Sequence, residues 1–215
     1  MMEKYNYRKD PHQDIDHVFR DLLPAHGMVE RPAQVELSHQ MLDAMLNGSI
    51  ALCDAGTGIG KTYAYLVAGV VFRRYRSRAG LPNQPLLIST SSIALQGAII
   101  HDYLPFLSKV MMADGMLDSP LRAVLRKGKS HYVCDARLMK RLQTANLDRK
   151  NPLAKAALLS MRDHLDLDMA PHLSGYDRER ICVPPTCDCG KTECRYLCYL
   201  DVCASERYAI QVCNH

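Results

Sequence analysis

The residues with the clearest chemistry in this sequence of 215 residues are Ala-Gly-Thr-Gly-Ile-Gly-Lys-Thr at 55–62. Glycine permits backbone conformations closed to larger residues, so successive N–H groups can turn inward around a phosphate. In this pattern the lysine reaches the β- and γ-phosphates, and the last hydroxyl ligates Mg²⁺. We therefore predict a nucleotide and Mg²⁺ site, with Lys61 and Thr62 as its catalytic residues. Its predicted phosphate contacts are Ala55, Gly56, Thr57, Gly58, Ile59, Gly60, Lys61 and Thr62.

Cysteines form the second group with a distinct chemistry. Six of the nine cysteines fall within residues 182–203, far denser than scattered core cysteines would be. Because the sequence starts without the apolar core of an export signal, metal binding is favoured over disulfides. Thiolates hold zinc or iron–sulfur clusters. Structural zinc sites usually contain Cys-x2-Cys pairs, and this sequence has none, so the residues alone leave both metals open.

Charge and hydropathy narrow the class of partner. Residues 51–150 hold 15 basic and 6 acidic side chains, although the net charge of the chain is only +4. Such a segment predicts a polyanion partner, with a solvated basic face as the alternative. No stretch approaches the ~18 apolar residues of a membrane helix. We expect a cytoplasmic protein without a membrane partner.

Hydrophobic periodicity predicts the elements that must position these residues. Upstream of the glycine-rich stretch it predicts helices over 11–23 and 33–46, then a buried strand over 50–53. A helix over 62–76 follows, whose terminal arginines are expected to be solvated. Because a strand precedes the stretch and a helix follows it, an ordinary glycine-rich turn is disfavoured.

Further along, the pattern alternates between short strands and helices. A helix from Ser91 or Ser92 should be limited by Pro105, and 181–203 should be a loop held by its metal. Cys53 and Cys213 fall in predicted buried strands and are expected to be core residues. The other predicted elements are strands over 86–90, 121–126 and 208–213 and a helix over 153–165.

Several motifs in one order resemble a known family. These are Arg31-Pro32-Ala33-Gln34, DAGTGIGKT, LLISTSSIALQ, RKGKSHYVC, a cysteine-rich insert and a terminal VCNH. Together they resemble the DinG/XPD group of iron–sulfur superfamily 2 DNA helicases, above all its bacterial DinG-like branch. The resemblance implies an α/β fold: an incomplete RecA-like first motor lobe of the P-loop NTPase class, with an inserted cysteine-rich iron–sulfur domain. The implied domains are a helical lead-in at 1–30, the ATP-binding lobe at 31–128, the insertion at 129–205 and a return strand at 206–215.

The resemblance also implies roles for single residues. Arg31 and Gln34 would contact ATP, with the Gln34 amide pairing with adenine. Ser89, Thr90 and Gln96 would contact single-stranded DNA; a helix cap with an exposed polar residue is the alternative. Lys127, Lys129 and Tyr132 would contact phosphates and stacked bases.

For the metal, the resemblance implies one cysteine far upstream and three close together. The preferred set is Cys134, Cys182, Cys187 and Cys194, in which Cys189 can replace Cys187. The alternative triplet is Cys189, Cys194 and Cys198. The expected cofactor is a [4Fe–4S] cluster, with Zn²⁺ as the alternative. Its role is expected to be structural, since residues 130–205 hold few large apolar residues.

An ATP-driven motor also needs an apolar strand that ends in Asp-Glu, and the sequence has none. We therefore expect the amino-terminal part of a longer protein. The resemblance implies that this protein is an ATP-dependent DNA helicase of 5′ to 3′ polarity that acts on single strands and duplex junctions. The part itself is expected to bind ATP weakly and not to hydrolyse it. A different class remains as the alternative: a short, nucleotide-gated, metal-bearing module that binds single strands. A phosphate-loop kinase with a zinc lid is less favoured, because it leaves Gln34 without a role.

Overall fold

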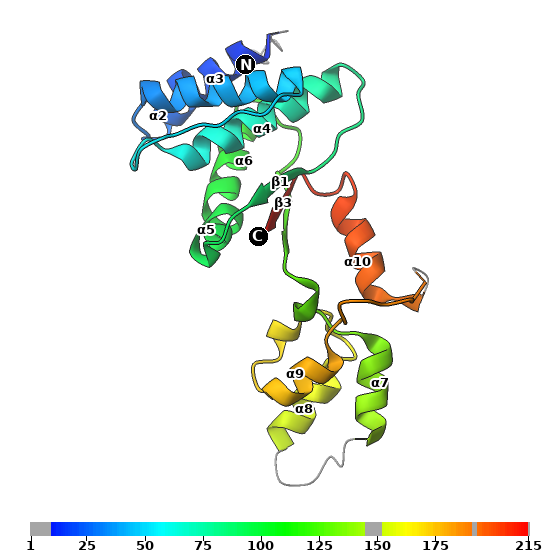
Figure 1. Ribbon diagram of the computed structural model, residues 1–215. Coiled ribbons are helices and arrows are strands. Elements are labelled where there is room, and N and C mark those ends of the chain that lie inside the picture. The colour runs from blue at the N-terminus through cyan, green and yellow to red at the C-terminus, as the bar shows by residue number, and fades with distance from the viewer. Residues whose placement is uncertain (1–9, 145–151, 191–192, 215) are drawn as a thin grey trace. The chain divides into compact units, whose positions relative to one another are not determined.

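The computed structural model describes residues 10–144, 152–190 and 193–214. The chain divides into two compact units. The first unit contains the residues up to 125 together with 206–213, and the second contains 126–205. Figure 1 shows the helices and strands of both units.

The first unit begins with a helical run that covers its core. Helix α1 (Pro11–His17) continues as a π-helical turn, η1 (Val18–Leu22), and ends in α2 (Leu23–Ala25). Asp10 caps the run by accepting a hydrogen bond from the His12 N–H. The helix predicted over 11–23 is confirmed, and its apolar stripe is buried as the periodicity requires.

Two longer helices, α3 (Pro32–Asn47) and α4 (Lys61–Arg78), run beside each other. Helix α3 ends at Gly48, whose φ of 62° lies in the left-handed region that favours glycine. In α4, Gly69 faces β1, and a Cβ at this position would overlap Leu86 Cδ1. Both predicted helices are confirmed.

The sequence predicts solvated arginines at the end of α4, but the structure shows that these arginines have partners within the protein. Arg73 and Arg76 donate to the carbonyls of Gln84 and Pro82, which fastens the loop after the helix. Two further arginines, Arg74 and Arg78, lie within 3.8 and 3.1 Å of the buried carboxylate of Asp14. A long guanidinium side chain reaches such acceptors because its apolar stem packs along the helix.

The strand predicted over 50–53 is wrong. These residues form no strand, and Ile50 and Leu52 are 92% and 97% exposed. Cys53 is exposed as well, so it is not a core residue. An apolar run becomes a buried strand only where a neighbouring strand pairs with it, and within the described ranges none does.

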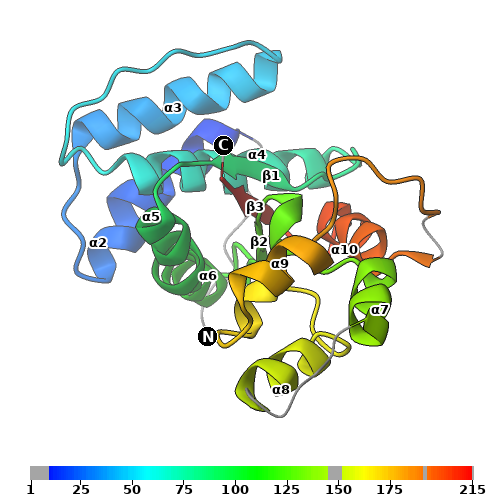
Figure 2. The ribbon, with the colours of Figure 1, turned by 60° about the horizontal axis from the view of Figure 1, so that its bottom comes forward.

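In the described part of the first unit, three strands form a sheet in the order β1-β3-β2 (Figure 2). These are β1 (Leu86–Ser89), β2 (Ala123–Arg126) and β3 (Ile210–Cys213). Strands β1 and β3 pair in parallel, with Leu86 opposite Ile210 and Ser89 opposite Cys213. The central strand thus comes from the end of the chain. The α/β class is confirmed.

Between β1 and β2, the chain forms α5 (Ile93–Ala98), a π-helical turn η2 (Ile99–Tyr103) and α6 (Leu104–Ala113). Ser92 caps α5 by accepting from the Leu95 N–H. The prediction that Pro105 limits this helix is wrong. Since Leu104 N–H bonds to Ile99 O, the wider π turn accommodates the missing N–H and the ring of the proline.

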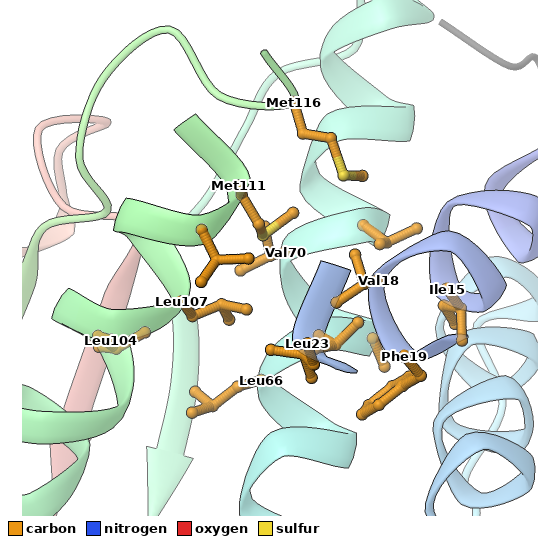
Figure 3. Packing of buried hydrophobic residues seen from close by; sticks show 14 of the residues in the cluster. Ile15, Val18, Phe19, Leu23, Leu66, Val70, Leu104, Leu107, Met111 and Met116 are labelled. Atoms are coloured by element: carbon orange, nitrogen blue, oxygen red, sulfur yellow. The ribbon is translucent and has the colours of Figure 1, made fainter. Parts of the chain in front are cut away.

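The core of the first unit is one continuous apolar cluster (Figure 3). Leu66 and Val70 of α4 lie between the first helical run, which contributes Val18 and Leu23, and α6, which contributes Leu107. Each of these side chains is at most 2% exposed. Burial of this kind contributes ~1.5–3 kcal/mol for each large side chain.

The second unit consists of short helices. They are η3 (Lys129–His131), α7 (Asp135–Thr144), α8 (Pro152–Ser160), η4 (Leu167–Met169), α9 (Gly175–Ile181) and α10 (Arg195–Ala204). The helix predicted over 153–165 is shorter than expected. The loop predicted over 181–203 is wrong at its end, because residues from Arg195 form α10. No helix in the described residues is long and apolar enough to span a membrane.

Apolar and polar side chains hold the second unit together. Its main apolar cluster contains Val133, Leu138, Ala157, Leu158, Met161, Leu167, Ala170, Leu173 and Ile181. Arg195 adds polar contacts: its Nε donates to both oxygens of Asp135 at 2.9 and 3.0 Å, and its Nη1 and Nη2 donate to the carbonyls of Arg162 and Met161. These bonds connect the start of α10 with the start of α7 and the end of α8.

Candidate nucleotide site and cysteine cluster

The glycine-rich loop precedes α4 directly, as the motif requires. Gly58 and Gly60 have φ values of 85° and 92°, a region that residues with a Cβ rarely adopt. Lys61 is the first residue of α4, so the free N–H groups of the helix begin where the loop ends. Such a start favours an anion through its N–H groups and the helix dipole.

The Lys61 ammonium lies over the loop. Its Nζ donates to the carbonyls of Ala55 and Gly56 at 2.7 and 3.0 Å. The ammonium therefore already faces the inside of the turn, where the phosphates of a nucleotide would lie. Phosphate oxygens would replace these two carbonyls as its partners.

Gln34 and Arg31 contact the same loop from the start of α3. Gln34 Nε2 donates to Gly60 O at 2.6 Å, and Arg31 Nη1 donates to Gly58 O at 2.7 Å. Gln34 is only 3% exposed, and a Cβ on Gly60 would collide with its amide. The structure thus brings both residues predicted for ATP together with the phosphate loop.

A cavity of about 390 Å³ lies beside this contact and is lined by residues of the loop after α2, of α3 and of α4. Gln34, Gly60 and Thr62 line it together with Tyr63 and Tyr103. The two tyrosine rings meet edge to face at 5.2 Å, and burial raises the pKa of Tyr63. The sequence analysis missed both tyrosines, although Tyr63 directly follows the motif. Their rings supply an apolar wall next to the amide of Gln34.

The residues predicted to contact single-stranded DNA at the end of β1 interact with one another. Gln96 Nε2 donates to Thr90 O at 2.7 Å, and Thr90 Oγ1 accepts from the Ser92 N–H. Gln96 is buried. Thr90 continues the sheet by donating its N–H to Cys213 O, and Ser89 ends β1. The amide of Gln96 therefore closes the turn between β1 and α5.

In the second unit, the residues predicted to contact phosphates and bases have protein partners. Lys127 Nζ donates to Asp166 and Asp168 at 2.6 and 2.7 Å, and these contacts raise its pKa despite partial burial. Lys129 donates to the carbonyl of Pro185. Tyr132 is 3% exposed rather than presented to solvent. Its hydroxyl accepts from the Lys127 N–H.

Two cysteine thiols of the second unit, Cys187 and Cys189, have shifted pKa values. The pKa of Cys189 is raised to about 11, first by its hydrogen bond with Cys187 and then by the charges of Cys187, Cys134 and Cys194. The pKa of Cys187 is lowered, first by the hydrogen bond from the Cys189 side chain. Three of the four predicted ligands, Cys134, Cys187 and Cys194, thus contribute to the raised pKa of Cys189. In the ranges that the structure describes, no three metal-binding side chains stand in a coordinating arrangement.

Cys182, the remaining predicted ligand, has other partners. Its Sγ donates to Glu179 O at 3.4 Å and lies 3.8 Å from Arg137 Nη1. Its backbone stands opposite Val133, next to Cys134. Cys203 is fully buried in α10, and Cys198 is exposed. The donor chemistry of Cys134, Cys187, Cys189 and Cys194 suits zinc or an iron–sulfur cluster.

Three curated proteins are similar to part of this chain. The 3′-5′ exonuclease DinG of Bacillus subtilis is 31% identical over 139 residues, 65% of this chain and 13% of that protein. The ATP-dependent DNA helicase YoaA of Haemophilus influenzae is 31% identical over 129 residues, 60% of this chain. The ATP-dependent helicase DinG of Mycobacterium tuberculosis is 30% identical over 126 residues, 59% of this chain. This chain is homologous to DinG-like proteins.

The match covers only a small part of the length of each DinG-like relative. The chain spans 18% of the length of both the Haemophilus YoaA and the Mycobacterium DinG. No protein-family model matches the chain. The resemblance expected from the motifs is nevertheless confirmed, because the similar proteins carry DinG and YoaA names.

Proposed function

We propose that this chain binds ATP with Mg²⁺ as part of a RecA-like motor lobe in a DinG-like DNA helicase. One observation carries the proposal: Gln34, Arg31 and Lys61 all bond to the backbone of the same glycine-rich loop. In this role Lys61 holds the β- and γ-phosphates, and Thr62 ligates Mg²⁺. Gln34 donates to Gly60 through Nε2, which leaves its Oε1 to accept from the exocyclic amine of adenine.

Equilibrium binding of a fluorescent ATP analogue tests the nucleotide site. We expect Lys61→Ala and Gln34→Ala each to weaken binding by about tenfold, the loss of one charge-assisted or buried hydrogen bond. Lys109→Ala, an exposed lysine of α6, is the matched control and should leave the affinity unchanged. Equal affinities for the chain and for Lys61→Ala would contradict the site. In addition, GTP should bind less tightly than ATP, and this preference should disappear in Gln34→Ala.

We propose further that residues 129–205 form an insertion whose thiolates hold a [4Fe–4S] cluster. Cys134, Cys187 and Cys194 would supply three ligands, and either Cys182 or Cys189 would supply the fourth. The pKa of Cys189 is raised first by its hydrogen bond with Cys187 and then by the charges of Cys187, Cys134 and Cys194, and a bound cation would favour the thiolate forms of these cysteines. A bound cluster would join the ends of this unit through metal–thiolate bonds.

Anaerobic purification followed by iron, labile sulfide and zinc analysis tests the metal. We expect iron and sulfide in equal amounts, and zinc alone would contradict the cluster. Cys134→Ser and Cys194→Ser should lose the iron, and Cys53→Ser, in the first unit, should retain it. Whichever of Cys182→Ser and Cys189→Ser loses the iron identifies the fourth ligand. If both retain it, the proposed ligand set is wrong.

For the whole protein we propose translocation on single-stranded DNA in the 5′ to 3′ direction and unwinding at duplex junctions. The names of the helicase relatives support this activity, and the exonuclease name of the Bacillus relative gives a rival one. Binding of single strands to this chain should weaken with salt, with a log–log slope of about −0.7 per phosphate contact. A salt-independent affinity would contradict the phosphate contacts. Release of nucleotides from a labelled 3′ end by the full-length protein would favour the exonuclease.

A further inference from the structure

The first unit has a second cavity, of about 650 Å³, that the nucleotide site does not use. It is bounded by α4 from Val70 onward and by the segments that lead into the three strands, including Asn83, Leu121 and Ala209. Val70 is nine residues beyond Lys61, which corresponds to about 14 Å along the helix. The cavity therefore lies where the strands begin, whereas nucleotide sites of such sheets lie where the strands end.

Basic side chains dominate the wall of this cavity. Five arginines line it against two carboxylates, those of Asp118 and Glu206. Three of the arginines already have partners within the protein. Arg73 donates to Gln84 O, and Arg74 and Arg78 lie beside the Asp14 carboxylate. The lining arginines are Arg73, Arg74, Arg78, Arg122 and Arg207.

The other two arginines, Arg122 and Arg207, are available for a ligand. Among the described residues, neither guanidinium makes a hydrogen bond or an ion pair. They stand just before β2 and β3, and these strands are neighbours in the sheet. Guanidinium groups present pairs of N–H donors that match the oxygens of a phosphate.

A polar atom in the same cavity also lacks a partner. Asn83 Oδ1 is buried and accepts no hydrogen bond within the described part of the chain. A buried acceptor without a donor is unfavourable, and a hydroxyl donor in the cavity would supply the missing hydrogen bond. The cavity thus combines cations for an anion, an acceptor for a hydroxyl, and apolar surface from Val70 and Leu121.

We propose that this cavity is a second ligand site that binds a phosphate ester carrying free hydroxyl groups. The phosphate lies on Arg122 and Arg207, a hydroxyl donates to Asn83 Oδ1, and the carbon skeleton packs on Val70 and Leu121. A free sugar phosphate and the phosphorylated end of a nucleic-acid strand share this chemistry.

Titration calorimetry of the Lys61→Ala chain tests the site apart from the phosphate loop. We expect ribose 5-phosphate to bind, and the double variant Arg122→Gln, Arg207→Gln to lose about a hundredfold in affinity, roughly tenfold per charged hydrogen bond. Asn83→Ala should weaken ribose 5-phosphate about tenfold but leave inorganic phosphate unchanged. Lys109→Gln is the control and should change neither. Absence of binding by Lys61→Ala, or equal affinity in the double arginine variant, would overturn the proposal.

Two oligonucleotides that differ only in a 5′-phosphate or a 5′-hydroxyl distinguish the two sources. If the strand end is the ligand, the phosphorylated strand binds tighter, and the double arginine variant removes the difference. If the two strands bind equally while ribose 5-phosphate binds, the ligand is a free ester. Because the guanidinium groups of Arg122 and Arg207 make no hydrogen bond or ion pair with the described residues, circular dichroism should show an unchanged fold in these variants.

Discussion

The two units of this chain are held together in different ways. Among the residues that the structure describes, 21 buried apolar residues form one cluster in the first unit, whereas the main cluster of the second unit contains nine. The second unit has in addition charged hydrogen bonds such as that from Arg195 to Asp135. The comparison shows that the glycine-rich loop belongs to a unit with a large apolar core, whereas the cysteine-rich unit depends more on polar contacts.

The largest difference is expected from truncation of the cores. Leu66→Ala in the first unit should lower its free energy of unfolding by about 3–5 kcal/mol, because a fully buried side chain leaves a cavity. Leu138→Ala in the second unit should cost about 2 kcal/mol, since a smaller core collapses more readily. Hydrogen exchange followed by mass spectrometry in urea reports each unit separately. Leu52→Ala, at a position 97% exposed, is the control and should stay within about 0.5 kcal/mol.

A matched pair of glycines sharpens the packing argument in the first unit. Gly69→Ala should destabilise this unit by about 1–3 kcal/mol, because the new methyl group would overlap Leu86. Gly97→Ala, in α5 and with nothing within 4 Å of the new Cβ, should instead stabilise it by about 0.5–1 kcal/mol. Thermal unfolding of both variants measures the difference. Equal effects would show that α4 does not pack closely on β1.

A smaller effect is expected when the side-chain hydrogen bonds of Arg195 in the second unit are removed. Arg195→Met should lower the stability of this unit by about 1 kcal/mol, a modest value because a third of the side chain is exposed. The control Lys140→Met removes an exposed charge from α7 instead. Hydrogen exchange should speed up in α7 and α10 only in Arg195→Met. Faster exchange in the first unit as well would contradict the separation of the units.

The smallest expected effect depends on pH. The hydrogen bond from Lys127 lowers the pKa of Asp168 from 3.8 to about 2. Because the folded pKa is below the unfolded one, the carboxylate stabilises the second unit fully above pH ~4, and this contribution is lost as the pH falls toward ~2. In Asp168→Asn, the free energy of unfolding of the second unit should fall less steeply as the pH decreases from ~4 to ~2. A curve that keeps its slope would show that the ion pair adds nothing.

Much of the architecture could be predicted because its causes are local. The helix from 11, the end of α3 at Gly48 and the start of α4 at Lys61 follow from caps, glycine conformations and periodicity within a few residues. Predictions failed where the local structure depends on a neighbouring segment and not on the residues themselves. Ile50 and Leu52 have the composition of a buried strand but lack a neighbour, and Pro105 continues a helix because a π turn precedes it.

The sequence by itself determined the phosphate loop, the succession of helices and strands around it, and the supply of thiols. Tertiary structure alone decided which of these groups meet. Gln34 reaches Gly60 across 26 positions, and the neighbours of Cys189 include Cys134, 55 residues earlier. It also buried Tyr132, and it left Arg122 and Arg207 facing a cavity. The reason is physical: backbone preferences act over a few residues, whereas contacts between distant side chains depend on how the elements pack.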